Sequence, residues 1–148
     1  EKGFMYYNDK FWPDEVQIHF QKIQLKPLEI GLKTNIRDIY FQGDKTSLYA
    51  KSKPAVDELI EWMKINPKVK IAVIGHVNGP NNEKSERFFN KAALERANSV
   101  VEYMLSKGVS TDRLISRGKG NTEMIFPDPK TNWENEANRR VEIEIIGL

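Results

Sequence analysis

Hydrophobic and polar residues follow two different periods along the chain, and each period predicts a different kind of element. Residues 16–25 alternate apolar and polar side chains, which is typical of a strand with one buried face. Residues 52–66 carry apolar side chains at helical spacing, with Pro54 in the first turn, and predict an amphipathic helix. A second helix is predicted over 88–107, and Gly108 is a natural residue to end it.

Four further short runs of apolar residues predict strands. They cover 37–42, 69–74, 113–117 and 139–146, and the run at 69–74 is apolar enough for a buried central strand. Strands interleaved with amphipathic helices indicate an α+β fold, in which the helices pack on a mixed β-sheet. The strands at 37–42 and 69–74 are expected to be parallel if they lie in one sheet, because a helix connects them by a right-handed crossover.

The N-terminal part of the chain has a different character. Residues 1–15 are rich in aromatic side chains but show no clear period, so we expect an irregular arm that packs on the domain. The predicted organisation is therefore an N-terminal arm with an extra strand over 1–35, followed by the main domain over 36–148.

Composition narrows the functions that this chain could perform. Its 148 residues, 39% of them hydrophobic, suffice for one core, and its net charge of +2 argues against a nucleic-acid-binding or membrane-surface role. No apolar run is long enough to insert in a membrane. The absence of cysteine excludes disulfides and thiolate metal sites, and two histidines make a multi-histidine metal site a poor prediction. We predict no cofactor.

Arg96 is the first residue that simple packing does not explain. On the predicted helix it borders the apolar stripe, so its guanidinium is expected to be partly buried and to need an anionic or carbonyl partner. That partner is either a carboxylate of the sheet or the carboxylate of a ligand, which the planar fork can bind with two hydrogen bonds.

Arg139 is the second such residue. It stands two positions before Val141 and is expected on the same, inward face of the last strand, as a structural anchor. Arg140 would then point the other way, into a solvated pair beside Glu142 and Glu144.

The loop at residues 75–80 leaves the carboxyl end of the predicted central strand, where α/β sheets often place binding sites. It contains the turn-forming pair Asn78-Gly79. His76 could act as a general base, but no nucleophile motif accompanies it, so a structural hydrogen bond is the favoured interpretation.

These motifs, taken in order, resemble the C-terminal domain of the OmpA/MotB family. The matching pieces are Ile74-Gly75-His76-Val77-Asn78-Gly79, Arg96-Ala97-Asn98-Ser99-Val100, Gly118-Lys119-Gly120 and Asn138-Arg139-Arg140-Val141-Glu142-Ile143. The resemblance covers residues 36–146, and the loop sequence resembles Bacteroidota-type members. It implies a two-layer sheet-and-helix fold.

The resemblance also implies a function. Members of the family bind peptidoglycan noncovalently in the periplasm and anchor an outer-membrane or envelope protein to the cell wall, without catalysis. An aspartate of the loop takes the ammonium group of the diaminopimelate in the stem peptide, and an arginine matching Arg96 takes its carboxylate. The ligand-binding residues expected from it are Asn78, Arg96, Gly79, Val77, Asp44 and Arg139.

The chain departs from the family pattern in the expected ammonium site. Asn78 replaces the aspartate, Val77 replaces a threonine and Phe89 falls at the position of an asparagine. One hypothesis is that Glu83 or Glu86 supplies the missing negative charge.

The alternative function is that of a protein–protein interaction module in an envelope complex, which keeps the fold but has lost wall binding. A binding module requires an open pocket between Arg96 and the loop at 75–80. An interaction module would instead satisfy Arg96 internally, for example through Asp44 or Glu95, and fill the cavity with Phe89.

Overall fold

The computed structural model describes residues 27–37, 39–41, 47–79 and 86–148. The arm expected at 1–15 and the strand expected at 16–25 lie outside the described residues. Within the described part, no helix combines the length and the apolar character needed to cross a membrane.

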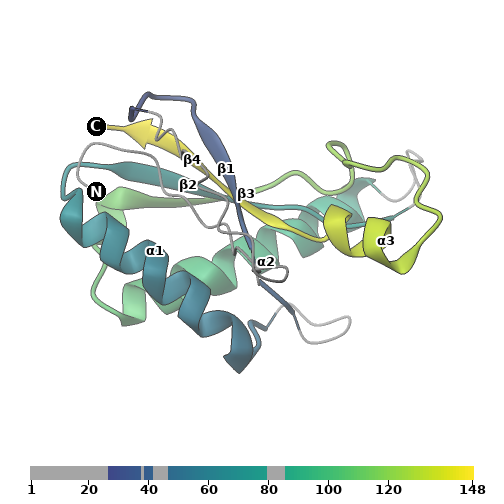
Figure 1. Ribbon diagram of the computed structural model, residues 1–148, viewed down its shortest axis with the longest axis horizontal. Helices are drawn as coiled ribbons and strands as arrows, with labels where there is room; N and C mark the ends of the chain where they lie inside the picture. The colour runs from purple at the N-terminus through teal and green to yellow at the C-terminus, as the bar shows by residue number, and fades with distance from the viewer. Residues whose placement is uncertain (1–26, 38, 42–46, 80–85) are drawn as a thin grey trace, which may run out of the picture.

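A four-stranded mixed sheet forms the centre of the molecule (Figure 1). Its order is β1 (Lys33–Ile36), β4 (Val141–Gly147), β2 (Lys70–Gly75) and β3 (Leu114–Gly118). β4 is antiparallel to both β1 and β2, whereas β2 and β3 are parallel. β1 and β2 are therefore parallel to each other, as expected for strands joined by a helix, but β4 lies between them. The prediction of an α+β fold with a mixed sheet is confirmed.

The first strand begins earlier than the sequence pattern indicated. The predicted strand at 37–42 is wrong: among its described residues, 37 and 39–41, only Phe41 pairs across, in an isolated bridge to Leu48, and β1 itself ends at Ile36. β1 is an edge strand in which Ile36 is the one buried residue, so it carries almost no alternating hydrophobic signal.

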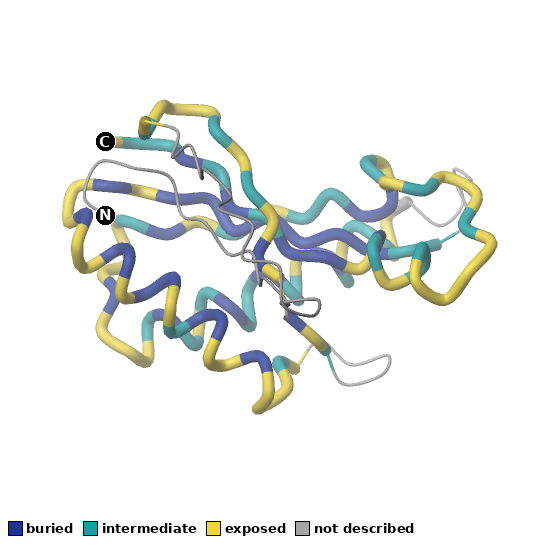
Figure 2. Tube along the Cα trace, viewed as in Figure 1, coloured by how far each residue is buried: buried dark blue, intermediate teal, exposed yellow. Residues whose placement is uncertain are grey.

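Two helices, α1 (Lys53–Ile65) and α2 (Glu86–Ser106), lie on the same side of the sheet (Figure 1). Their buried stripes face the strands and close one hydrophobic core (Figure 2). The buried side chains from the helices include Val56, Leu59, Ile60, Met63, Ala97, Val100 and Met104, and those from the strands include Ile71, Val73, Val141, Ile143 and Ile145. Both helices confirm the predicted elements to within two residues, and Gly108 adopts the positive φ of 88° expected after α2.

Ser52 stands at the N-cap position of α1, but its hydroxyl does not cap the helix. It accepts a hydrogen bond from the Tyr40 amide at 2.8 Å and donates one to the Tyr40 carbonyl at 3.2 Å. This buried serine therefore attaches the segment at 39–41 to the start of α1, and that segment forms one wall of the pocket described below.

A short helix, α3 (Asn132–Asn138), occupies part of the region that we expected to be a long loop. Thr131 and Glu134 form a capping box at its start, in which each side chain bonds the backbone of the other residue. The T-x-x-E signal was present in the sequence, but a seven-residue helix has no room for a hydrophobic period. Because α3 and its final cap occupy residues up to Arg139, β4 begins at Val141 rather than at 139.

Candidate binding pocket

A pocket of about 500 Å³ lies where the loop after β2, the first half of α2, the segment at 39–41 and α3 meet. Four of the predicted ligand-binding residues, Val77, Asn78, Arg96 and Arg139, line it. The lining residues are Ile39, Tyr40, Phe41, Tyr49, Lys51, Val77, Asn78, Phe88, Phe89, Ala92, Arg96, Glu136 and Arg139.

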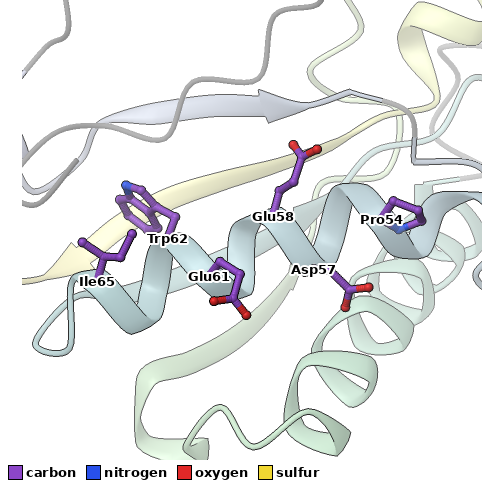
Figure 3. Close-up of a pocket in the computed structure, with 6 residues that line it drawn as sticks. All are labelled: Pro54, Asp57, Glu58, Glu61, Trp62 and Ile65. Atoms are coloured by element: carbon purple, nitrogen blue, oxygen red, sulfur yellow. The ribbon is translucent and has the colours of Figure 1, made fainter.

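A second hollow of similar size lies on the outer side of α1 (Figure 3). Three of its lining side chains are carboxylates, Asp57, Glu58 and Glu61, and none of its lining residues is basic. It contains none of the residues that the sequence motifs indicated. The pocket beside Arg96 is therefore the candidate site.

Arg96 projects from α2 and is half buried, as its position beside the apolar stripe predicted. Its Nη1 donates a hydrogen bond to the carbonyl oxygen of His76 at 3.4 Å, and its Cζ lies 5.2 Å from the centroid of the Phe41 ring. The Phe41 face stabilises the cation and restricts the plane of the guanidinium. Glu95, one of its expected internal partners, lies 3.9 Å from Lys91, and Asp44 lies outside the described residues.

The side chain of Asn78 is held by two asparagines of α3. Its amide nitrogen donates to Oδ1 of Asn135, and its oxygen accepts from Nδ2 of Asn138, both at 2.8 Å. Asn138 is fully buried and also bonds both the amide and the carbonyl of Phe126, which fixes the orientation of its own side-chain amide. The side-chain amide of Asn135 is oriented in the same way, because its Nδ2 donates to the Thr131 carbonyl. The loop after β2 is thus joined to α3 by neutral hydrogen bonds.

Val77 lines the pocket with an apolar side chain, whereas Gly79, also predicted to bind the ligand, does not line it. Val77 is buried, and its amide donates to the Gly120 carbonyl at 2.9 Å. A Cβ at Gly79 would lie 2.3 Å from the Phe89 ring, so this ring sits directly on the glycine. Phe89 therefore lines the pocket and covers Gly79, and the space beside Arg96 stays open.

The structure reverses the predicted roles of the two arginines before β4. Arg139 is the exposed cap of α3, and its Nη1 lies 2.7 Å from Oε1 of Glu136, so the prediction of an inward anchor is wrong. Arg140 is the buried one: it pairs with Glu142 as predicted, but the prediction that this pair is solvated is wrong. The alternation of a strand does not extend to 139 because the backbone there leaves a helix. Arg139 nevertheless lines the pocket, together with Glu136.

Beneath the loop, Arg140 and His76 share the carboxylate of Glu142. Nε of Arg140 lies 2.8 Å from Oε1, and Nε2 of His76, whose side chain is 1% exposed, lies 3.3 Å from Oε2. The His76 ring and the Arg140 guanidinium lower the pKa of Glu142 from 4.5 to about 2 against the opposing effect of burial. The backbone amide of His76 donates to the Arg140 carbonyl, which fits the structural role predicted for this histidine.

The same network includes a second acidic residue, Glu123. Ligand atoms of His76, Glu123 and Glu142 lie within 4.8 Å of one another, a spacing that a metal ion could use. Each carboxylate already has a cationic partner, however, since Nζ of Lys119 lies 2.7 Å from Glu123 and Arg140 pairs with Glu142. We interpret the cluster as a charge-balanced support for the loop at 75–79.

Sequence reasoning missed several residues of the pocket. Lys51, Tyr40 and Tyr49 belong to it, and Lys51 lies with its Nζ 4.0 Å from the centroid of the Tyr40 ring. Glu136 was also missed, although its spacing of three from Arg139 is the signal of a helical ion pair. The described lining contains three basic residues, Lys51, Arg96 and Arg139, and one acidic residue, Glu136. This excess of positive charge suits an anionic ligand group.

Comparison with known proteins supports the resemblance to the OmpA/MotB family. The sequence profile of the OmpA family matches residues 40–139. Outer membrane protein A of Bordetella avium is 30% identical over 128 residues, which cover 86% of this chain and 64% of that protein. The chain spans 33% to 64% of the length of the first curated relatives it matches.

Two solved structures share the fold. The periplasmic domain of Helicobacter pylori MotB (residues 78–256) superimposes with a TM-score of 0.66 at 21% identity, over 82% of this chain and 80% of that one. The peptidoglycan-associated lipoprotein of Burkholderia pseudomallei gives a TM-score of 0.61 at 14% identity, over 74% and 88%. Since the family profile covers about two thirds of the sequence, this chain belongs to the OmpA family.

Proposed function

We propose that this domain binds peptidoglycan noncovalently through the diaminopimelate of the stem peptide and anchors an outer-membrane-associated protein to the wall in the periplasm. The observation that carries the proposal is that Arg96 and the Asn78 loop line one open pocket, as a binding module requires. The family is non-enzymatic, and related folds include the cell wall anchor of a type VI secretion system from Pseudomonas aeruginosa. The GHVNGP loop supports a Bacteroidota-type relationship within the family.

The carboxylate of the ligand is assigned to Arg96. The guanidinium is half buried and backed by Phe41, so a bidentate carboxylate would bind there in a site partly shielded from water. Lys51 and Arg139 on the pocket wall add to the positive potential.

The ammonium of the ligand is assigned to Glu136 rather than to Asn78. Both ends of the Asn78 amide are already bonded to α3, so this side chain has little left to offer a cation. Glu136 is the one carboxylate among the described lining residues, and its side chain remains 60% exposed while it pairs with Arg139. Of the glutamates that the sequence suggested for this role, Glu83 lies outside the described residues, and the side chain of Glu86 is not described either.

Sedimentation with purified diaminopimelate-type sacculi tests the carboxylate assignment. The wild type should sediment, and Arg96→Ala should bind at least tenfold more weakly, because a hydrogen-bonded ion pair with the ligand is lost. Arg117→Ala is the matched control, since Arg117 of β3 pairs with Glu144 of β4 and does not line the pocket. A wild-type protein that stays in solution would contradict the proposal.

The ammonium assignment is tested with a diaminopimelate tripeptide and its analogue acetylated at the side-chain amine. The wild type should prefer the free amine, and Glu136→Gln should abolish that preference. Glu61→Gln is the control, because Glu61 and Lys64 form an exposed ion pair of the same spacing on α1 at 2.7 Å. If Asn78→Asp sharpens the preference instead and Glu136→Gln leaves it unchanged, the ammonium belongs at position 78.

The interaction module remains the second candidate, and one observation favours it. Phe88, which is 69% exposed, lines the same pocket as Tyr40 and Tyr49, which are each 39% exposed. Such a cluster of exposed aromatic rings suits a protein partner. Sacculi that fail to bind the wild type, together with co-purification of an envelope protein that Phe88→Ser abolishes, would support this function.

A further inference from the structure

A smaller hollow of about 280 Å³ adjoins the candidate pocket on the side of α3 and β1. The two hollows share four lining residues, Ile39, Tyr40, Glu136 and Arg139. Tyr40 and the Glu136–Arg139 ion pair therefore form a common wall, and a ligand seated beside Arg96 can continue across that wall without leaving the surface.

Trp133 distinguishes this second hollow. It is the second residue of α3, and 69% of it is exposed. It is one of the most exposed large apolar residues described, with Phe88, Ile30 and Leu148. Its ring packs edge-to-face on Phe126, with centroids 5.1 Å apart and an interplanar angle of 61°. The capping box holds the backbone on which it stands. The indole is thus held in place while much of its surface faces solvent, which lowers the entropy cost of using it as a contact surface.

Polar side chains line the hollow together with the exposed indole. Asn35 of β1 and Arg37 line the hollow from one side, and Arg139 lines it from the other. Amide and guanidinium groups are planar donors that suit neutral hydroxyl and carbonyl acceptors. An aromatic surface edged by such donors matches a sugar ring, which has an apolar face and a rim of hydroxyl and acetamido groups.

We propose that the hollow at Trp133 is a subsite for an N-acetylated amino sugar of the glycan strand. The inference rests on the proposed function, because the stem peptide of peptidoglycan is attached to such a sugar. Diaminopimelate is the third residue of that peptide, so three residue-to-residue links connect it to the sugar, a reach of roughly 11 Å or slightly more when extended. A stem peptide bound beside Arg96 must therefore keep its sugar close, and the adjoining hollow supplies the surface for it.

Comparing two ligands distinguishes the sugar subsite from the peptide pocket. One is the disaccharide-tripeptide released from sacculi, and the other is the same tripeptide without sugar. By calorimetry, the wild type should bind the disaccharide-tripeptide about five- to tenfold more tightly. Trp133→Ala should remove this advantage and leave tripeptide affinity unchanged, and unchanged tripeptide binding also shows that the variant is folded. Trp133→Phe, which can keep the contact with Phe126, should retain part of the advantage.

Ile115→Ala is the control variant, because Ile115 is an exposed apolar residue on β3 that lines neither hollow. Equal affinity of the wild type for the two ligands would overturn the sugar subsite and leave the peptide site standing. Equal weakening of both ligands by Trp133→Ala would also overturn it, since the residue would then support the peptide pocket. If the wild type binds neither ligand, the proposed function and the subsite fall together.

Discussion

At the scale of single residues, the replacement of an aspartate by Asn78 changes more than charge. The amide nitrogen of Asn78 makes the bond to Asn135 that a carboxylate could not make, because Oδ1 of Asn135 is an acceptor. Backbone groups of Phe126 and Thr131 orient the amides at the two ends of this network. Asn78 therefore depends on the asparagines of α3 for its hydrogen bonds. The side chain at 78 carries no charge, but it helps to fix α3, and α3 places the carboxylate of Glu136 in the pocket.

Glu142 gives a pH dependence that belongs to one residue. Its pKa is about 2 in the folded protein and 4.5 ordinarily, so its contribution to stability is complete above pH 4.5 and is lost as the pH falls toward 2. The shift corresponds to a loss on the order of 3 kcal/mol over that interval. Glu142→Gln should be less stable than the wild type at pH 7. Urea unfolding of both proteins between pH 2 and 7 should show the difference in their unfolding free energies narrowing as the pH falls.

Glu144→Gln is the control for that experiment, because Glu144 lies on the same face of β4 and pairs with Arg117 rather than with His76. It should keep most of the acid sensitivity of the wild type. An unfolding free energy of Glu142→Gln that runs parallel to the wild type across the whole range would show that the buried ion pairs do not act as described.

At the scale of elements, helix α2 approaches the sheet so closely that only glycine fits at two strand positions. A Cβ at Gly75 would lie 2.0 Å from the Ala93 carbonyl oxygen, and one at Gly118 would lie 2.6 Å from that of Asn90. The glycines that end β2 and β3 thus let the backbone of α2 sit directly against them. Since Arg96 lies less than one turn beyond Ala93, this contact also sets how deep the guanidinium lies in the pocket.

Gly75→Ala should therefore destabilise the protein by about 2–3 kcal/mol, because backbone atoms cannot move aside as a flexible side chain can. It should also weaken binding to sacculi even under conditions where the protein stays folded. Gly147→Ala is the control, since a Cβ there meets only the Lys70 side chain at 3.3 Å. Urea unfolding measures both, and equal stability of the two variants would contradict the close-packing argument.

The elements also show what could be read from sequence and what could not. The helices at 53–65 and 86–106 and the central strand were predictable because each has a strong period or an unbroken apolar run. β1 and α3 were not, since a four-residue edge strand and a seven-residue helix bury too few side chains to leave a pattern. Missing α3 caused the error over Arg139 and Arg140, and it hid Glu136 and Trp133 from the site.

In the site itself, a residue could be predicted from the sequence where its neighbours in space are also its neighbours along the chain. Arg96 was recognisable because helical spacing alone put a charge beside an apolar stripe. The partners of Asn78 lie 57 and 60 residues away, so no spacing rule could indicate them. The boundary between 1–35 and 36–148 stays a prediction; β1 runs across it as part of the sheet.

At the scale of the whole molecule, a net charge of +2 creates an alternative explanation for wall binding. Sacculi carry many carboxylates, and a basic protein could adhere to them without using any pocket. The two modes respond differently to salt, because exposed charges are screened over about 10 Å at 0.1 M and about 3 Å at 1 M, whereas partly buried pairs are screened much less.

Binding through half-buried Arg96 should therefore persist when sodium chloride is raised from 0.1 M to 0.5 M, with a loss of only a few fold in affinity. Any residual sedimentation of Arg96→Ala should disappear over the same range, because it would depend on exposed lysines and arginines alone. The comparison is made with one batch of sacculi and both proteins at equal concentration. If the wild type and Arg96→Ala lose binding in parallel as salt rises, adhesion is a property of net charge, and the pocket would have to be assigned to another ligand.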